Sequence, residues 1–504
     1  MAQRGARQAF STAWLLPLLF LASPALAVPS FNLEAGPFMS SAAIQSAVGS
    51  YSTTQPGASG PGLRVYYVYA SSDIRSAITS DGVTFAPEAG VRLSSRTVPP
   101  LDIAVSSITG CSALPLPGGG FRMLYSVVGA TGTFRIYSAT SADGLSWAND
   151  TGTRIEINGG STFAGLPSLV QLGTGNWRLY YVQNSLPGNQ KANHQIFTAL
   201  STNQGLSWST GAVAVPALAG EVAASVRTDG RIRLYYTAPL SGATTDTTVL
   251  SALSRDANGT VFSAETGIRL STSVLTSTLS YPFLARSTDT FSWRMYYVAT
   301  AIGQSPGEAL SAVTNAPDPQ AIAPHTVFQN NTAVSFNISG EIFSSAPIAA
   351  ALTQSGQPNI AGTALTRADD QNLSATFNTQ NQNLGLWNLV VTNTNGLSTT
   401  LPNALLVDYE PGVLTLLDNL IRPRLGTRTK ITVTIFAPGN VSLKVYTLNG
   451  EFLNTLLDAQ EPAGTFSVFW DGRTGSGRAV ASGVYLLRSK GPKIDSIEKI
   501  VVIK

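Results

Sequence analysis

The sequence predicts an all-β protein, built from a five-bladed β-propeller followed by two β-sandwich domains. Three observations support this. A strand motif recurs five times at nearly equal spacing, the C-terminal part alternates apolar and polar residues between Gly- and Asn-rich turns, and charged residues make up only 12% of the chain. At 504 residues the chain is too long for one hydrophobic core. A prior of about 150 residues per domain gives about three domains.

The recurring strand motif is a short stretch with an arginine in second position. Its copies are LRVYYVYA, FRMLYSVV, WRLYYVQN, IRLYYTAP and WRMYYVAT, which begin at residues 63, 121, 177, 232 and 293. Each copy is followed by a second strand, a turn and a third strand, and the next unit opens with a short apolar strand. Four strands per unit are typical of a propeller blade. We expect SSAAIQSAV, residues 40–48, to supply the missing first strand and close the ring.

The turn after the second strand also recurs, as TSDGVTF, SADGLSW, STNQGLSW and SRDANGTVF. SADGLSW looks like part of an active site, but a stretch used at least four times is better explained as a structural turn. Its acid or amide is expected to accept hydrogen bonds from its own backbone, and its aromatic residue to pack between strands. The residues assigned to this role are Asp81, Asp143, Trp147, Asn203, Trp208 and Asp256. The five repeated arginines are likewise interpreted as structural links between blades.

The first 27 residues have the three-part pattern of a secretory signal peptide. Arg4 and Arg7 precede the apolar run WLLPLLFLA, and SPALA ends in small residues, with cleavage expected after Ala27. The run is too short to cross a bilayer, and no later stretch reaches about 18 apolar residues. We therefore expect a protein that is secreted or displayed at the cell surface and does not span the membrane. A single cysteine, Cys111, excludes an intrachain disulfide and favours a bacterial source.

Charge and metal-ligand content exclude several functions. A net charge of +3 is too small to indicate nucleic-acid binding. Residues 411–504 carry a net +5 and residues 28–410 a net −4, so the tail either docks to an acidic surface or is an ordinary solvated face. The only histidines, His194 and His325, are far apart, and Asp369 and Asp370 lack the spacing of a calcium loop. No cofactor and no metal are expected.

Two breaks divide the chain after its signal peptide. NAPDPQAIAP, at residues 315–324, reads as a linker, and DYEPG, at residues 408–412, is a second break. The expected domains are therefore the propeller at 28–316 and sandwiches at 317–409 and 410–504.

Both sandwiches resemble known immunoglobulin-like domains. FNISGEIF, residues 336–343, and GLWNLVVTNTNGLSTTLPNALLV, residues 385–407, resemble an IPT/TIG domain, which implies a spacer or interaction role. VSLKVYTLNGEFLNTL and the pattern from Trp470 to Tyr485, WDG through SGVY, resemble the immunoglobulin-like domain of the flagellar hook-capping protein. Similar domains act as C-terminal sorting signals, so this resemblance implies secretion or sorting machinery as a partner.

The repeats of residues 28–316 resemble five-bladed glycosidase propellers of the arabinanase and xylosidase type, with turns similar to the Asp-box of sialidases. The resemblance implies paired carboxylates on the inner strands, which typically begin Asp-Pro-Ser. This sequence departs from that pattern, because Leu166 stands before Pro167 in GLPSLVQL and Tyr281 stands before Pro282 in SYPFLA. Cys111 and Ser112 stand where another blade would carry an acid.

Two acids remain near the inner strands, Glu221 and Asp102, and they are the catalytic candidates; Tyr281 is a candidate ligand-binding residue. Glycoside hydrolysis normally needs two carboxylates that flank the scissile bond. Our leading hypothesis is therefore a propeller that binds an extracellular glycan or a surface protein without a complete hydrolytic apparatus. A glycoside hydrolase and a purely structural surface protein are the alternatives.

Overall fold

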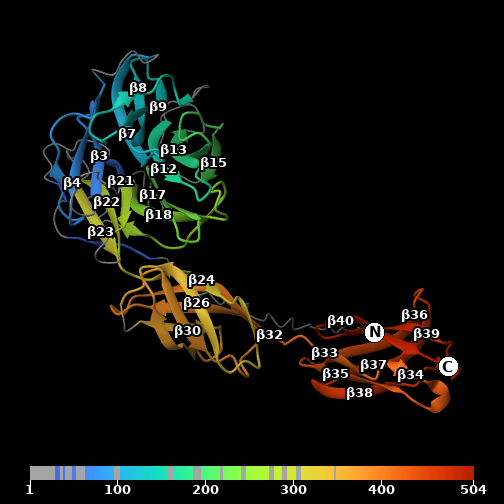
Figure 1. The fold of residues 1–504 in the computed structure, drawn as a ribbon. Coiled ribbons are helices and arrows are strands. Elements are labelled where there is room, and N and C mark those ends of the chain that lie inside the picture. Colours follow the sequence, from blue (N-terminus) through green and yellow to red (C-terminus); the bar gives the residue numbers. More distant parts are fainter. Residues whose placement is uncertain are drawn as a thin grey trace, which may run out of the picture.

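The computed structural model confirms the all-β fold, a five-bladed propeller followed by two immunoglobulin-like sandwiches (Figure 1). It describes residues 29–34, 38–39, 48–52, 63–95, 103–156, 164–184, 194–209, 211–215, 219–239, 246–271, 277–286, 292–301, 308–345 and 348–504. The expected signal peptide and Asp102 lie outside these residues. Within them, the only helical element is the short 3-10 turn η2 (Pro423–Leu425).

Each propeller blade is an antiparallel sheet whose first strand lies nearest the centre. The first two blades contain β2 (Val48–Ser52), β3 (Leu63–Tyr69), β4 (Asp73–Thr79), β5 (Ala86–Pro87) and β6 (Leu93–Ser94), and then β7 (Val105–Pro115), β8 (Phe121–Gly129), β9 (Phe134–Ser141), β10 (Ala148–Asn149) and β11 (Ile155–Glu156). The third contains β12 (Ala164–Gln171), β13 (Trp177–Asn184), β14 (His194–Ser201) and β15 (Ala212–Val215). The fourth contains β16 (Val222–Val226), β17 (Ile232–Pro239), β18 (Asp246–Ser254), β19 (Phe262–Ala264) and β20 (Leu270–Ser271).

The fifth blade closes the ring. It contains β21 (Ser277–Arg286), β22 (Trp293–Ala301) and β23 (Glu308–Thr314), with β1 (Asn32–Leu33) as its outermost strand. The inner strands contact one another in the order β2, β7, β12, β16, β21 and back to β2. The first strand of blade one is β2, which starts at Val48; the rest of the expected segment, residues 40–47, lies outside the described part of the chain. The strand that completes blade five is instead β1, which the sequence analysis missed because two residues carry no periodicity.

The paired tyrosines of the strand motif explain how the blades pack. Neighbouring residues on a strand point to opposite faces. Tyr66 packs with Cys111 and Tyr125 of blade two, whereas Tyr67 packs on the other face with Phe38 and Tyr296. Both tyrosines are buried because each blade is covered on both faces by its neighbours.

The middle sandwich packs two sheets around Trp387, Phe336 and Phe377. One sheet contains β24 (Asp318–Ala323), β26 (Val334–Glu341), β30 (Asn372–Phe377) and β29 (Thr363–Arg367). The other contains β25 (Thr326–Phe328), β32 (Ser398–Asp408), β31 (Gly385–Thr392), β27 (Ala349–Thr353) and β28 (Ile360–Ala361).

The C-terminal sandwich packs a small sheet and a larger one around Trp470 and Tyr485. The small sheet contains β33 (Val413–Leu417), β35 (Thr429–Ile435) and β38 (Gly464–Trp470). The larger contains β34 (Leu420–Ile421), β40 (Ile494–Val502), β39 (Gly483–Gly491), β36 (Gly439–Thr447) and β37 (Phe452–Glu461).

Buried charges join the propeller to the middle sandwich. Asp318 at the start of β24 accepts a 3.0 Å hydrogen bond from Arg233 of β17, and Arg227 lies 3.6 Å away. Although burial acts to raise it, these arginines hold the pKa of Asp318 below its ordinary value. Glu341 accepts a 2.6 Å hydrogen bond from the Trp293 indole. The contact therefore fixes the sandwich against blades four and five.

Candidate ligand site in the central funnel

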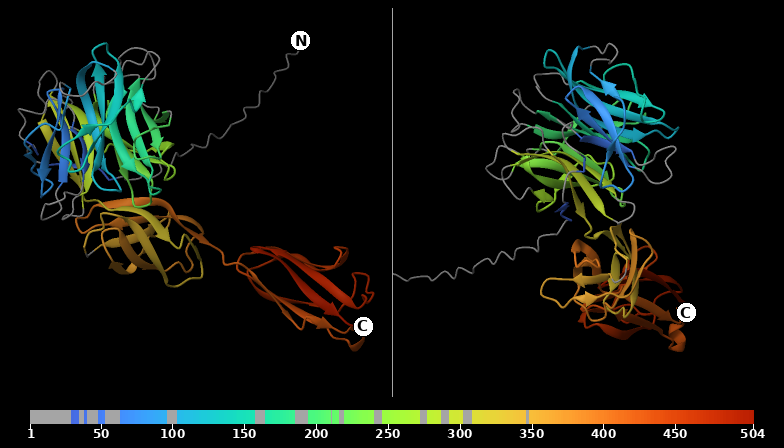
Figure 2. Two further views of the ribbon diagram at one scale, coloured as in Figure 1. Left: turned by 45° about the horizontal axis from the view of Figure 1, so that its top comes forward. Right: turned by 90° about the vertical axis from the view of Figure 1, so that its left-hand side faces the viewer.

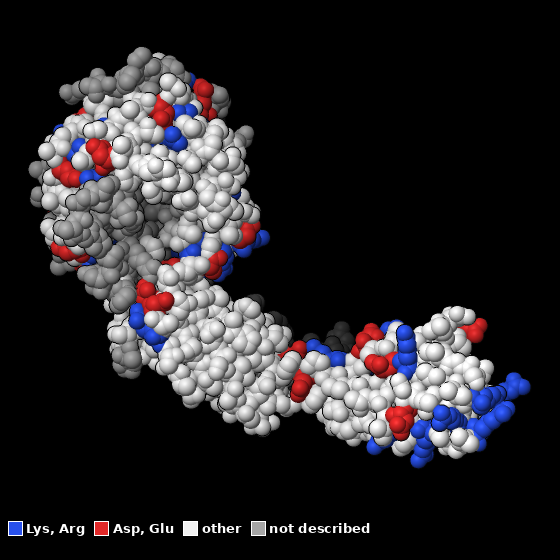
Figure 3. Space-filling model, in the orientation of Figure 1, with Lys and Arg blue, Asp and Glu red and all other residues white. Residues whose placement is uncertain are grey.

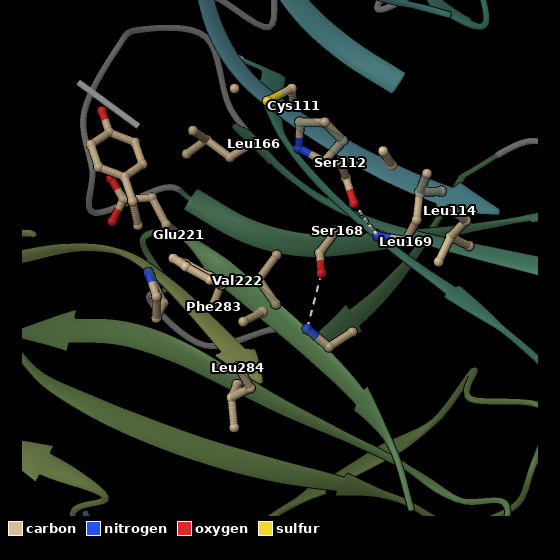
Figure 4. A pocket seen from close by; sticks show the side chains of 17 residues that line it. Cys111, Ser112, Leu114, Leu166, Ser168, Leu169, Glu221, Val222, Phe283 and Leu284 are labelled. Carbon is tan, nitrogen blue, oxygen red and sulfur yellow. Dashed lines mark hydrogen bonds between the residues drawn. The ribbon is translucent and has the colours of Figure 1, made fainter. Parts of the chain in front are cut away.

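The inner strands enclose a cavity of about 110 Å³ at the propeller axis (Figure 4). Four of the five blades supply described lining residues. These are Gly110–Leu114 of β7, Leu166–Leu169 of β12, Glu221–Ala224 at β16 and Tyr281–Leu284 of β21. Most of the lining residues have apolar side chains, although polar atoms form about as much of the exposed wall as apolar ones, and Glu221 is the one acid among the described residues that form it.

Two inner strands bulge where they reach the cavity. Leu166 and Tyr281 adopt left-handed backbone conformations, with φ of 59° and 54°, and each precedes a proline. The pairing register shifts between Gly165 and Ser168, and again between Ser280 and Phe283. Such strained positions in non-glycine residues concentrate at functional sites, and bulges re-aim side chains. The bulges place Leu166 and Tyr281 on the cavity wall.

The serines on the wall hold neighbouring blades together. Ser112 accepts a 3.0 Å hydrogen bond from the Leu169 backbone N–H, and Ser168 accepts one of 3.0 Å from Ala224 (Figure 4). These hydroxyls thus join blade two to three and blade three to four. Cys111 is almost fully buried, and burial raises the pKa of its thiol. The thiol therefore stays protonated, which does not suit a nucleophile.

Glu221 is held from behind by Thr237 of β17. The Thr237 hydroxyl accepts a 2.9 Å hydrogen bond from the Glu221 backbone N–H and lies 3.0 Å from its carboxylate. The same hydroxyl lies 3.1 Å from Asp246, whose side chain is buried. A Cβ atom at Gly220 would come within 2.1 Å of both the hydroxyl and the Asp246 carboxylate. The packing thus fixes the carboxylate of Glu221 at the cavity and leaves Asp246 behind it.

Tyr281 provides a neutral phenol at the same cavity. Burial, with a smaller effect of the negative charge on Glu221, raises the pKa of Tyr281 above its ordinary value. The phenol therefore keeps its proton and can donate a hydrogen bond. Together Glu221 and Tyr281 form a polar pair, an acceptor and a donor, among lining residues that are mostly apolar.

The structure thus brings two of the candidate residues together, Glu221 and Tyr281, while Asp102 lies outside the described residues. Sequence reasoning missed Thr237 and Asp246. Thr237 ends a strand motif, and Asp246 follows a variable loop, so neither carries a sequence pattern. Asp246 is too buried to flank a bound substrate, so it does not supply the second carboxylate that hydrolysis needs.

The turn residues lie away from the cavity, after the second strand of each blade. Asp143 accepts hydrogen bonds of 2.8 Å from Leu145 and Ser146, and these bonds hold the pKa of its carboxyl below the ordinary value. Asp81 and Asp256 accept equivalent backbone bonds, and so does Asn203. The indoles of Trp147 and Trp208 each donate a 3.1 Å hydrogen bond to a glycine carbonyl in their own turn.

In blades one and five, the arginine and the tyrosine of the strand motif donate hydrogen bonds to backbone carbonyls in the turn of the next blade. Arg64 donates to the carbonyl of Asp143 at 3.1 Å, and Tyr66 donates to that of Gly144 at 2.9 Å. Arg294 and Tyr296 of the last blade make the same contacts to Gly82 in the first. Arg122 likewise donates to the carbonyl of Gln204 in the next blade, whereas Arg233 pairs with Glu265 of its own blade and with Asp318 of the middle sandwich. None of the five repeated arginines is among the described residues that line the funnel.

The described residues include no group of three or more His, Cys, Asp or Glu side chains placed to hold a metal ion. His194 lies on β14 in the propeller and His325 in the middle sandwich, so these two cannot share a site. In the same part of the chain, no helix is long and apolar enough to cross a membrane.

Among solved structures the propeller is similar to glycosidases. A thermostable family-43 glycoside hydrolase matches at 14% identity and a TM-score of 0.43, over 56% of this chain and 91% of its own. A GH43_1 enzyme from Xanthomonas citri complexed with xylose gives the same identity and TM-score, over 56% and 90%. An alpha-L-arabinofuranosidase from Podospora anserina in complex with cellotriose matches at 11% and 0.40, over 58% and 98%. No sequence family matches the chain, and no curated protein matches it. These similarities are too distant to carry an argument about activity.

Proposed function

We propose that the protein is an exported, multidomain glycan-binding protein. Its propeller funnel holds one end of a saccharide without hydrolysing it, and the two immunoglobulin-like domains act as spacer and as sorting or display element. The observation that carries this proposal is the funnel itself, in which the described lining offers one carboxylate and one neutral phenol beside apolar side chains.

The size and chemistry of the cavity favour a sugar over a protein segment. A cavity of about 150 Å³ holds a benzene ring, so about 110 Å³ accommodates part of a single ring. A sugar offers hydroxyl groups that donate to the Glu221 carboxylate and accept from the Tyr281 phenol. Its C–H face packs on apolar side chains such as Leu166 and Phe283.

The contact between the propeller and the middle sandwich supports the spacer role. Its buried ion pairs and the Trp293–Glu341 hydrogen bond hold the first two bodies in one arrangement. The export route rests on the sequence pattern of residues 1–27, and the sorting role rests on the resemblance of residues 410–504 to hook-capping-type domains.

Hydrolysis is the second candidate function, and one feature of the lining favours it. A general acid must lie within hydrogen-bond reach of the leaving group, and Glu221 is the carboxyl group that the described lining places at the cavity. In this alternative Glu221 protonates the leaving group and the second carboxylate comes from outside the described residues.

One experiment separates the two functions. A glycan array with the secreted chain identifies ligands, and the same saccharides are then assayed for release of reducing ends. We expect binding without turnover, and binding weakened at least tenfold in Glu221→Gln with the fold intact. Turnover by the native chain that is lost in Glu221→Gln would establish the hydrolase. If the chain binds no saccharide and no surface protein, the result would favour the remaining alternative, a purely structural surface protein.

A further inference from the structure

The C-terminal sandwich has one end that faces the middle sandwich and one that faces away from it (Figure 2). At the near end, Lys493 in the β39–β40 turn donates to Asp408 at 2.7 Å. The far end collects segments that are distant in sequence, since Gly483 pairs with Val502, Tyr485 with Thr447 and Trp470 with Thr429. The distal end is therefore formed by residues 417–430, 448–452, 469–484 and 503–504.

Exposed apolar side chains concentrate at the distal end. Of 19 large apolar side chains that are exposed in the described residues, eight lie here: Leu417, Leu420, Leu425, Leu448, Phe452, Phe469, Val484 and Ile503. Leu425 is the most exposed of all, at 73%, because it ends the η2 turn. Singly exposed leucines are common on any surface, but such a concentration marks an interaction site.

The same end is basic. It carries seven cations and three acids: Arg422, Arg424, Arg428, Lys430, Arg473, Arg478 and Lys504 against Asp418, Glu451 and Asp471. Among the described residues of the distal end there is one ion pair, between Arg473 and Asp471 at 3.4 Å. The Arg428 guanidinium lies 4.1 Å above the Phe469 ring, so charge and apolar surface adjoin. Figure 3 shows the blue side chains at this end of the molecule.

A soluble polyanion would account for the cations but not for the exposed leucines and phenylalanines. An interfacial membrane site needs both, because basic groups attract the anionic surface and apolar groups insert at the boundary of headgroups and acyl chains. Guanidinium groups also bind phosphate oxygens in a bidentate manner. We infer that the distal end docks on the surface of a bilayer that contains anionic phospholipid, with Leu425 inserted and Arg422, Arg424 and Arg428 on the headgroup phosphates.

This contact would hold the propeller away from the membrane, because the propeller lies at the opposite end of the molecule (Figure 2). The inference is independent of what the funnel binds. Loss of membrane binding would leave saccharide binding unchanged, and the converse also holds, so failure of either proposal is recognised separately.

Co-sedimentation of the full chain with lipid vesicles tests the inference. One set of vesicles is phosphatidylcholine alone, and the other also contains phosphatidylglycerol. We expect binding to the second set only, weakened by salt. Each surface cation contributes about fivefold to binding, so Arg422→Glu with Arg424→Glu should reduce it at least about 25-fold. Leu425→Ser should reduce it about tenfold through lost apolar burial.

Matched controls lie elsewhere on the same sandwich. Lys490→Glu with Lys499→Glu reverses the same amount of charge, and Ile497→Ser removes an apolar side chain that is 52% exposed. These variants should bind like the native chain, and all variants should keep its melting temperature. Equal weakening by the controls, or no binding to either set, overturns the inference. So does binding that Leu425→Ser leaves unchanged, which would indicate a soluble polyanion or a protein partner.

Discussion

The turns at the blade edges and the funnel at the propeller axis are both contributed by several blades, yet they differ in chemistry. At the edges, the strand motif and the turn recur from blade to blade, and donors such as Arg64, Tyr66 and Arg294 bind backbone carbonyls of the next blade. At the axis, the four blades with described lining residues each supply a different residue, Cys111, Leu166, Glu221 or Tyr281. Repetition serves the shared task of joining blades, whereas a ligand site needs one asymmetric arrangement. We therefore expect stability to depend on the edges and binding on the axis.

The largest expected effect is that of Arg64→Ala on stability. Arg64 is buried and forms a bidentate pair with Glu88, with N–O distances of 2.7 and 2.8 Å. Its removal leaves Glu88 without its partner and should lower the free energy of unfolding by about 3 kcal/mol. Arg135→Ala is the control, because its pair with the exposed Glu156 should contribute less than about 1 kcal/mol. Urea unfolding measures both, and equal losses would contradict the prediction.

Trp147→Ala should have the next largest effect. The indole packs edge-to-face on Tyr66 of the neighbouring blade, with ring centroids 5.5 Å apart, and it is partly exposed. We expect a loss of about 2 kcal/mol, below that of a core tryptophan. Saccharide affinity should stay within twofold of the native value. A large loss of saccharide affinity with little loss of stability would show that this blade-edge turn serves binding rather than stability.

The third prediction concerns the stability of the fold at acid pH. Bonds from the Thr79 hydroxyl and from the Thr84 and Val83 backbone lower the pKa of Asp81 to about 2. A carboxyl whose pKa is lower in the folded state stabilises above its unfolded pKa of about 3.9 and loses that contribution as the pH falls toward 2. The pKa of Asp143 is also lowered by hydrogen bonds from its turn.

The double variant Asp81→Asn with Asp143→Asn should therefore lose less stability than the native chain between about pH 4 and pH 2. Asn203 already forms the equivalent turn without a titrating group, so the substitution should fold. Thermal unfolding across this range measures the difference. If the stability of the two proteins falls in parallel as the pH is lowered, the two turn aspartates do not contribute to the loss of stability in acid.

The smallest expected effect on stability is that of Glu221→Gln. The amide can still accept from the Thr237 hydroxyl, so we expect a change within about 0.5 kcal/mol. Binding of the saccharide found on the array should nonetheless fall at least tenfold. A stability loss comparable to that of Arg64→Ala would place Glu221 among the structural residues and would remove the contrast between edge and axis.

The sequence by itself determined the repeating part of this protein. Five strand motifs and four turns specify the blade number, because each copy pairs with its neighbours in the same way and so leaves a periodic trace. Glu221 and Tyr281 could also be named, since one acid and one Tyr-Pro step stand out on the inner strands. Only the tertiary structure decided what surrounds them. Thr237, Asp246 and the strand β1 act through contacts across strands and blades, and such contacts follow packing rather than spacing along the chain. The distal end of the C-terminal sandwich has the same origin, since four separate segments make it both basic and apolar.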